Sequence, residues 1–334
     1  MSVGGNGRFD VVGIGNALVD ILGRVEDDFL AANGVEKGVM TLIDTARAAD
    51  LYGKMGPATE ISGGSGANTI AGLAMLGSRA AYVGKVRDDQ LGAIFAHDMR
   101  ALGAVFETPL SPADAEMETG RCMVLVSPDG ERSMNTYLGV SEHLAPSDID
   151  PGMMAAADWV YLEGYRFDGP DSHEAFAKAI RACKSGGGHI SATLSDPFCV
   201  DRHRDAFRVL IHDELDLLFA NEHEIMSLYQ TADLETALDA CAGDVDLAAI
   251  TVGPRGAYVL EGGTRTLVPT RAAEVVDATG AGDMFAAGFL HGLTSGRDTA
   301  TSARMGCIAA GEIIGHIGAR PEADLAGLMK SENL

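Results

Sequence analysis

Basic residues, paired cysteines and long apolar runs are scarce in this chain, and each shortage excludes a class of protein. Lys and Arg total 25 against 48 Asp and Glu, a net charge of −23, so neither nucleic acid nor an anionic membrane surface is a suitable partner. No apolar run approaches the roughly 18 residues that span a bilayer. The five cysteines include no C-x-x-C pair, which argues against a disulfide framework or a zinc knuckle and favours a reducing compartment. Because Met1–Arg8 has no signal-peptide core, we expect a cytoplasmic protein.

Two common nucleotide-binding motifs are also missing. No G-x-x-x-x-G-K-[ST] sequence occurs, so the chain does not bind phosphate through a P-loop. Gly13–Leu18 begins like the G-x-G-x-x-G of dinucleotide-binding proteins, but Leu18 would keep the helix from packing closely on its strand. A nicotinamide-dependent oxidoreductase on a similar sheet is therefore a disfavoured alternative. The nine histidines show no metal-binding spacing such as H-E-x-x-H.

What the chain does have is an alternation of short apolar runs with helical patterns. With 46% hydrophobic residues among 334, it can bury a large core. The runs that predict buried strands are Val11–Ile14, Ala80–Val83, Val160–Leu162, Leu215–Ala220 and Leu247–Val252. The spacing of apolar residues predicts helices over Asn68–Leu76 and Leu91–Leu102. Strands that alternate with helices predict an α/β fold, with a mostly parallel sheet covered on both faces.

Two segments, Asp20–Ile43 and Arg121–Leu138, break this alternation. The second contains the strand-like stretches Cys122–Val126 and Ser133–Leu138 around the turn Ser127–Gly130, which predicts a hairpin. We interpret the two segments as a small lid over a site, and an edge hairpin of the main sheet is the alternative. The predicted large domain consists of residues 1–15, 45–115 and 140–334, and the predicted lid of residues 16–44 and 116–139.

The strongest motif lies within Val275–Phe285, where an apolar strand end runs into small residues and then into a helix. Gly280, Ala281 and Gly282 would expose backbone N–H groups at the helix N-terminus, an arrangement that binds anions. Asp283 would repel a stored anion, but it suits a general base for a hydroxyl that attacks a phosphoryl group. The simpler alternative is that Asp283 only stabilises the helix N-terminus.

Five motifs in order resemble those of the ribokinase or PfkB family of carbohydrate and nucleoside kinases. They are Gly63–Asn68 (G-G-S-G-A-N), Gly84–Gly92 (G-x-x-x-x-D-x-x-G), Asn221–Glu224 (N-x-x-E), Thr251–Gly256 (T-x-G-x-x-G) and Asp277–Asp283 (D-x-x-G-A-G-D). The resemblance covers nearly the whole chain. It implies a ribokinase-like three-layer α/β/α domain with a mostly parallel central sheet and a small β-lid.

Further details resemble the adenosine kinases of that family. Gly15–Ile21 is similar to their G-N-x-L-x-D-I, Asp27–Leu30 to their D-x-F-L, and Leu194–Phe198 to their L-S-x-P-F. Arg132 heads a lid strand as in those enzymes. The di-glycine segment departs from them, because the Ser-Gly-Ala-Asn that follows Gly64 is closer to the ribokinase version.

The resemblance also implies roles for individual residues. Asp283 would be the general base, the Gly280, Ala281 and Gly282 amides the anion hole, and Arg132 a lid residue that swings onto the phosphates. The candidate substrate-binding residues are Asn16, Asp20, Gly63, Gly64, Ser65 and Asn68 for the sugar and Tyr165 and Phe198 for a purine ring, with ordinary core packing as the alternative for both aromatics. The candidate ATP-binding residues are Asn221, Glu224, Thr251, Gly253 and Gly256. Glu224 would bind Mg²⁺ through water, and Asp277 and Thr279 are candidates for K⁺.

We therefore predict an ATP- and Mg²⁺-dependent kinase that phosphorylates the 5′-hydroxyl of adenosine to AMP, as in purine salvage. Its partners would be ATP and a small-molecule substrate, and both a monomer and a homodimer remain open. A sugar kinase acting on ribose, fructose or a related ketose is the main alternative. A ligand sensor with a kinase fold is a further alternative, which the intact Asp283 disfavours.

Overall fold

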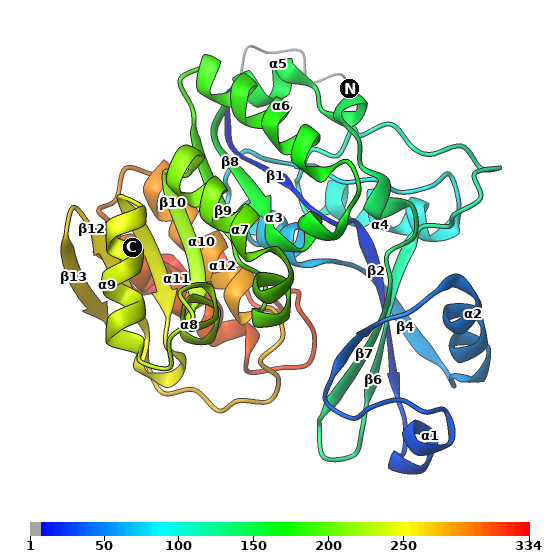
Figure 1. The fold of residues 1–334 in the computed structure, drawn as a ribbon. Helices are drawn as coiled ribbons and strands as arrows, with labels where there is room; N and C mark the ends of the chain where they lie inside the picture. The colour runs from blue at the N-terminus through cyan, green and yellow to red at the C-terminus, as the bar shows by residue number, and fades with distance from the viewer. Residues whose placement is uncertain (1–7) are drawn as a thin grey trace.

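Two β-sheets organise residues 8–334, which is the part of the chain that the computed structural model describes (Figure 1). Residues 1–7, which include the start of the predicted segment 1–15, lie outside the described residues. An eight-stranded sheet runs through the main body of the molecule. A five-stranded sheet projects from that body at the lower right of Figure 1, together with α1 (Asp27–Ala32) and α2 (Thr45–Lys54).

The large sheet has the strand order β13-β12-β11-β10-β9-β8-β1-β5. Its strands are β1 (Phe9–Ile14), β5 (Ala80–Val83), β8 (Ala157–Glu163), β9 (His189–Thr193), β10 (Leu217–Asn221), β11 (Leu247–Thr251), β12 (Ala257–Glu261) and β13 (Thr264–Val268). Neighbouring strands from β11 to β5 are parallel, whereas β11 with β12 and β12 with β13 are antiparallel. In this register Val12 lies between Ala81 and Val160. The prediction of a mostly parallel sheet is confirmed, and each predicted strand overlaps an observed one.

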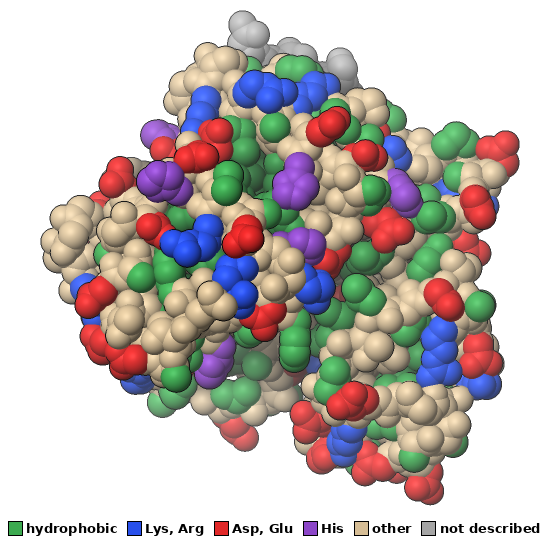
Figure 2. All heavy atoms as spheres, in the orientation of Figure 1, with side chains coloured by type: hydrophobic (Ala, Val, Ile, Leu, Met, Phe, Trp, Pro, Cys, Tyr) green, Lys and Arg blue, Asp and Glu red, His purple; other side chains and the backbone are tan. Residues whose placement is uncertain are grey.

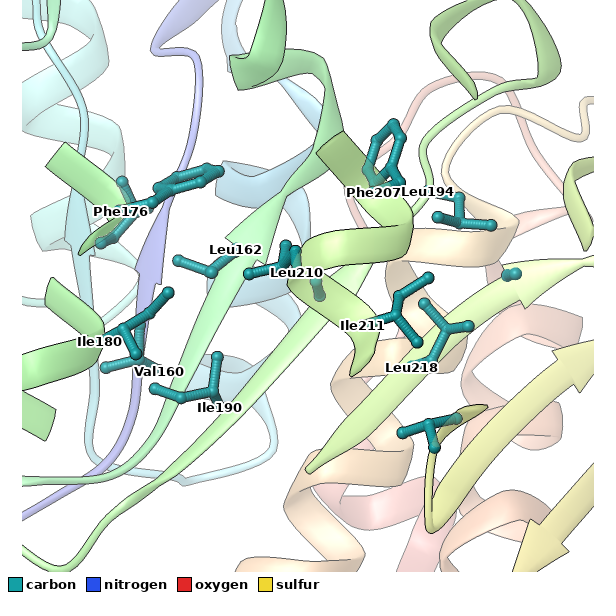
Figure 3. Close-up of a cluster of buried hydrophobic side chains, with 14 of the residues drawn as sticks. Val160, Leu162, Phe176, Ile180, Ile190, Leu194, Phe207, Leu210, Ile211 and Leu218 are labelled. Carbon is teal, nitrogen blue, oxygen red and sulfur yellow. The ribbon is translucent and has the colours of Figure 1, made fainter. Parts of the chain in front are cut away.

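Helices cover both faces of the large sheet, so the predicted three-layer α/β/α architecture is confirmed. One face carries α5 (Pro151–Ala155), α6 (Ser172–Ser185), α7 (Pro197–Glu214), α8 (Glu222–Leu228) and α9 (Leu234–Asp244); the other carries α3 (Ser65–Met75), α4 (Gln90–Ala101), α10 (Ala281–Thr294) and α11 (Thr299–Ile313), with α12 (Leu325–Ser331) against α11 and α3. Figure 3 shows Phe176 and Ile180 of α6 and Leu210 of α7 beside Val160 and Leu162 of β8. No helix within residues 8–334 has both the length and the apolar character that crossing a bilayer requires.

The smaller sheet has the order β3-β7-β6-β2-β4. Its strands are β2 (Leu18–Arg24), β3 (Met40–Leu42), β4 (Ala58–Gly63), β6 (Gly120–Val126) and β7 (Arg132–Tyr137). Successive side chains alternate between its faces: Ile21 and Met123 pack with Leu51 of α2, whereas Asp20 and Cys122 face a cavity. The predicted hairpin therefore belongs to this second sheet and not to an edge of the main one.

The second sheet takes in more of the chain than the boundary predicted at residue 45 allows. The helix α2 packs on β6 through Ala48 and Leu51, and β4 pairs antiparallel with β2 from Leu18 opposite Gly63 to Gly23 opposite Ala58. The sequence of β4, A-T-E-I-S-G, has no run of alternating apolar residues, and this is why its strand was not predicted. Residues 45–63 thus accompany the second sheet, and the chain returns to the main body at the glycine pair.

Candidate active site

A cavity of about 550 Å³ opens between the carboxyl ends of the large sheet's parallel strands and one face of the second sheet. Figure 2 shows the molecule hollowed between these two parts, with hydrophobic side chains inside the hollow. The edge at the carboxyl ends of the strands is where parallel α/β sheets bind ligands. Of the residues predicted for the site, those that line the cavity are Asn16, Asp20, Gly64, Ser65, Asn68, Tyr165, Asn221, Glu224, Thr251, Gly253, Thr279, Gly280, Ala281, Gly282 and Asp283.

Asp283 stands in the first turn of α10 and receives two hydrogen bonds from the first turn of α3. The Ser65 hydroxyl donates to its Oδ1 at 2.6 Å, and the Asn68 amide Nδ2 donates to its Oδ2 at 2.9 Å. Burial raises the pKa of Asp283 above its usual value, against the lowering effect of these two bonds and of Arg320. The result is a fixed carboxylate that faces the cavity and has more affinity for a proton than a solvated aspartate.

The turn before α10 leaves backbone N–H groups free at the same place. Gly280 has φ +80°, a left-handed conformation that favours glycine, and it ends the turn so that α10 begins at Ala281. The N–H of Ala281 donates to Ala278 O at 3.2 Å, so this amide is already used. The N–H groups of Gly280 and Gly282 have no acceptor within the described part of the chain. Two of the three predicted anion-binding amides are therefore available to a ligand.

Asp20 lies across the cavity, on β2, directly against the glycine pair at the end of β4. A Cβ on Gly63 would be 2.3 Å from the Asp20 carboxyl carbon, so a glycine is required for the two strands to pair with this side chain in place. Gly64, at φ +94°, then turns the chain into α3. Burial raises the pKa of Asp20 to about 6, while Arg320 and Arg132 lower it.

The orientation of two asparagine amides follows from their partners. The Asn16 Oδ1 accepts from Ser141 Oγ at 2.8 Å and from the Arg166 guanidinium at 3.0 Å, which can only donate. Its NH₂ is then left for the cavity. Asn68 is turned the other way, because its NH₂ donates to Asp283 and its Oδ1 is buried with no partner within residues 8–334. The Asn16 NH₂ is therefore a donor directed at the cavity, and the Asn68 Oδ1 is a buried acceptor that lacks a partner.

Sequence reasoning missed two buried charged residues, Glu163 and Arg166, that hold this region through separate hydrogen bonds. The Glu163 carboxylate accepts from the Asn16 and Gly66 N–H groups, so it fixes the turn after β1 and the start of α3. Burial raises the pKa of Glu163 to about 7, against these bonds. Arg166 donates to Ser141 O, Ser172 Oγ and two further carbonyls. The only available signal was a charged residue at each side of Gly164-Tyr165, directly after a buried strand.

The predicted nucleotide end of the cavity is built on α8. The Asn221 side chain caps this helix, and the Glu224 carboxylate accepts from the Asn221 N–H and from its Nδ2. Burial raises the pKa of Glu224 to about 7. Both Glu224 oxygens are thus engaged but keep free lone pairs, which fits the predicted contact with Mg²⁺ through water and does not fit direct ligation. No cluster of three or more His, Cys, Asp or Glu suited to a metal occurs among the described residues.

Five predicted residues do not line this cavity, and three of them, Phe198, Gly256 and Gly63, serve other parts of the structure. Phe198 is 72% exposed in the first turn of α7, because the next two residues, Cys199 and Val200, turn inward and leave its side chain on the surface. Gly256 has φ +104°, and a Cβ there would lie 2.0 Å from Val268 O, so it serves the turn into β12. Gly63 does not line the cavity but supports Asp20. Phe198 and Gly256 are corrections to the predicted substrate and ATP sites in this conformation.

Arg132 and Asp277 are paired with each other. The Arg132 Nη2 lies 2.7 Å from Asp277 Oδ2, with 8% and 5% of the two side chains exposed. The N–H groups of Thr279 and Gly318 donate to the two oxygens of the same carboxylate. Two N–H donors and a guanidinium cation in ion-pair contact do not fit a K⁺ site at Asp277, so this arrangement does not support the prediction for Asp277 and Thr279. Arg132 likewise faces Asp277 and lines a second cavity, not the one that contains Asp283.

Comparison with known proteins agrees with this geometry. Residues 40–324 match the family described as pfkB family carbohydrate kinase. A probable sugar kinase from Rhizobium etli CFN 42 is 47% identical, with a TM-score of 0.92 and coverage of 98% of this chain and 99% of the other. Adenosine kinase from Sinorhizobium meliloti is also 47% identical, with a TM-score of 0.91 and coverage of 97% and 99%. Adenosine kinase of Saccharomyces cerevisiae is 28% identical over 89% of this chain and 92% of its own length. With a family match that extends over most of its length, the chain belongs to the pfkB family of carbohydrate kinases and is a phosphotransferase with an alcohol group as acceptor.

Proposed function

We propose that the protein transfers the terminal phosphoryl group of ATP to the 5′-hydroxyl of adenosine, which gives ADP and AMP. The observation that carries the proposal is the position of Asp283, which lines the cavity beside the unpartnered Gly280 and Gly282 amides. A hydroxyl bound there meets a base and an anion-binding group together. Such positioning accounts for much of the rate in phosphoryl transfer, because the protein does little covalent chemistry.

In the proposed reaction the Asp283 carboxylate accepts the proton of the attacking hydroxyl. The Ser65 and Asn68 hydrogen bonds hold the carboxylate in one orientation, and the raised pKa makes it a stronger base than a solvated aspartate. The two free amides stabilise negative charge on the phosphoryl group as it is transferred. Mg²⁺, held through water at Glu224, would supply further neutralisation of the polyphosphate.

The polar groups at the other side of the cavity suit the ribose of the proposed substrate. Asp20 and the Asn68 Oδ1 would accept hydrogen bonds from the ribose hydroxyls, and the Asn16 NH₂ would donate one to them. A pair of neighbouring hydroxyls both donates and accepts, so it can satisfy all three groups at once. Asn68 would then link the sugar to Asp283 through a single side chain.

The apolar part of the lining supports a nucleoside over a free sugar. The second sheet and the segment that follows it contribute side chains that a flat purine ring would cover, namely Met40, Leu42, Met134 and Leu138, and Tyr165 lies in the same lining. A free sugar would leave this surface in contact with water. The adenosine kinase of S. meliloti, at 47% identity, adds support for the nucleoside.

The charge of the cavity bears on how ATP is accepted. Its lining includes six carboxylates, Asp20, Glu163, Asp168, Glu222, Glu224 and Asp283, and within the described part of the chain no Lys or Arg. A polyphosphate would be repelled there unless a cation came with it. The proposal therefore includes Mg²⁺ and a movement of Arg132 from Asp277 to the phosphates when ATP binds. The second sheet, which carries Arg132, would act as the lid in this movement.

The test is an ADP-release assay with adenosine, inosine, ribose and fructose as acceptors at matched concentrations. We expect kcat/KM to be highest for adenosine, with AMP as the product by mass spectrometry. The control acceptor is 5′-deoxyadenosine, which keeps the purine and the 2′,3′-diol but lacks the 5′-hydroxyl; it should inhibit and yield no ADP. Phosphorylation of 5′-deoxyadenosine would show that a different hydroxyl is the acceptor.

A sugar kinase is the second candidate, since the R. etli relative named as a probable sugar kinase is equally identical, and Asp20, Asn16 and Asn68 would bind a free sugar as well. The variant Met134→Ala separates the two candidates. It should raise KM for adenosine and leave any turnover of ribose or fructose unchanged, because the purine would contact Met134 on β7, whereas the sugar would contact Asp20 on β2. Equal or better turnover of a free sugar by the unaltered protein would overturn the nucleoside proposal.

A further inference from the structure

Arg320 stands in the segment between α11 and α12 and reaches across to the glycine pair. Its Nη2 donates to the Ser62 hydroxyl at 3.0 Å, and Ser62 directly precedes Gly63. Its Nε and Nη1 are buried and have no partner within residues 8–334. The side chain lines, with Asp20 and Arg132, a second cavity of about 740 Å³ behind the sugar end of the site. No motif in the sequence pointed to this residue.

The charge of Arg320 acts on both carboxylates of the proposed mechanism. Arg320 lowers the pKa of Asp20 on β2 and of Asp283 on α10, and those two acids with Asp98 of α4 favour its charged form. Burial lowers the pKa of Arg320 to about 10, so the guanidinium remains charged near neutral pH. Tyr82 of β5 is the further group that faces it.

The remaining groups around the two aspartates do not replace that charge. Around Asp20 they are Arg132, which is paired with Asp277, and Cys122, whose thiol has a pKa raised by burial to about 12 and is neutral. Around Asp283 they are Ser65 and Asn68, which donate to it, and four acidic groups whose pKa it raises, Tyr161, Glu163, Tyr165 and Glu224. Apart from the paired Arg132, Arg320 is therefore the cation that acts on the two carboxylates within the described part of the chain.

The way Arg320 is held leaves the carboxylates free for a ligand. Its one strong hydrogen bond goes to Ser62, and none of its nitrogens donates to Asp20 or Asp283 within the described structure. A direct, bidentate pair would occupy the oxygens that the sugar and the reacting hydroxyl need. Two like charges in a site with little water also raise each other's pKa, so one of them would be protonated without a nearby cation.

We infer that Arg320, buried behind Ser62 and lining the second cavity together with Asp20, is a positioning residue whose charge keeps Asp20 ionised beside Asp283, so that one carboxylate binds the sugar while the other accepts the proton. The inference rests on the proposed function. It assigns the acid side of the enzyme's pH profile to a residue that lies outside the two motifs containing Asp20 and Asp283. It also explains why an arginine with two unpartnered nitrogens is buried at the foot of the glycine pair.

The test compares Arg320→Met with Arg320→Lys over the pH range in which the protein is folded. In Arg320→Met the acid limb of kcat/KM should move up by about one pH unit, because a nearby opposite charge shifts the pKa of a carboxylate by that order. The loss of activity should be larger at pH 6 than at pH 8, and Arg320→Lys should restore the wild-type limb. Arg24→Met is the control, since Arg24 is exposed on the same second cavity; it should leave the limb unchanged.

A second measurement separates this inference from the proposed function. In protein with ¹³C-labelled aspartate carboxyls, assigned with Asp20→Asn, the titration midpoint of Asp20 should rise by about one unit in Arg320→Met, whether or not the enzyme turns over adenosine. An unchanged midpoint, or an unchanged acid limb in an active enzyme, would overturn the inference and leave the proposed function intact. If Arg320→Met and Arg320→Gln both fail to fold, Arg320 serves the fold and the positioning role is wrong.

Discussion

The motif Asp277–Asp283 has an aspartate at each end, one before α10 and one in its first turn, and the two lie in opposite surroundings. Asp277 accepts hydrogen bonds from the Thr279 and Gly318 N–H groups and forms an ion pair with the Arg132 guanidinium, and it lines no part of the cavity with Asp283. Asp283 has two neutral donors, faces the cavity, and has a pKa raised by burial. Two aspartates six positions apart are therefore held differently: Asp277 is fixed by close partners, and Asp283 is left able to react.

The comparison shows that a motif does not by itself say what each of its residues does. Arg132 belongs to β7 of the second sheet, whereas Asp277 belongs to the main body, so their pair joins the two parts of the molecule. A carboxylate whose charge is balanced by close partners contributes to the stability of the fold. A carboxylate whose charged form is disfavoured by burial is available for chemistry. Substitution of Asp283 should therefore affect mainly activity, and substitution of Asp277 mainly stability.

The largest expected effect is on turnover, at Asp283. Asp283→Asn should lower kcat by roughly 10²–10⁴, the usual contribution of a general base, with KM for adenosine near the wild-type value. Because burial already disfavours the charged form, the uncharged asparagine should leave the urea midpoint unchanged or higher. Steady-state kinetics and urea unfolding on the same preparation measure both. A kcat within a few-fold of wild type would contradict the role of Asp283 as the base.

The next effect is on stability, at Asp277. Asp277→Asn leaves the buried Arg132 without its counter-charge, and breaking a buried pair in this way costs about 3–5 kcal/mol. We expect a lower urea midpoint at pH 7 and a smaller fall in kcat than in Asp283→Asn. The control is Asp50→Asn, whose exposed pairs with Lys54 and Arg47 should contribute at most about 1 kcal/mol. If Asp277→Asn has the stability of wild type and the kcat of Asp283→Asn, the two ends of the motif do not differ as described.

Much of the fold followed from patterns that extend over several residues. The runs Val11–Ile14 and Ala80–Val83 are apolar throughout because helices cover both faces of the sheet, and such runs are recognisable without a structure. The candidate site was predicted where residues fall in compact motifs. Asp283, Ser65 and Asn68 stand at fixed places in two of them, and the structure brings all three to one cavity.

What could not be predicted depends on contacts between distant segments. Arg166 and Arg320 are single charged residues outside any motif, and their roles exist only because folding buries them beside Asn16 and Asp20. Phe198 follows Asp196-Pro197 in a motif, but the rotation of α7 decides which way its ring points, and this depends on the core beneath. A lone methionine such as Met134 is more often a gap filler, so the sequence alone gave little reason to place it in the site.

The smallest expected effect is the response to potassium. Since the Arg132 guanidinium supplies a positive charge at Asp277 before ATP binds, replacing K⁺ by Na⁺ at constant ionic strength should leave the urea midpoint of the ligand-free protein unchanged. In Arg132→Met the carboxylate has only the Thr279 and Gly318 N–H groups as partners, so K⁺ should raise the urea midpoint of this variant above its value in Na⁺. Unfolding of both proteins is measured without ATP in K⁺, Na⁺ and tetramethylammonium buffers. A urea midpoint of the unaltered protein that is clearly higher in K⁺ would show that a cation binds at Asp277 beside Arg132, which would remove the contrast between the two aspartates.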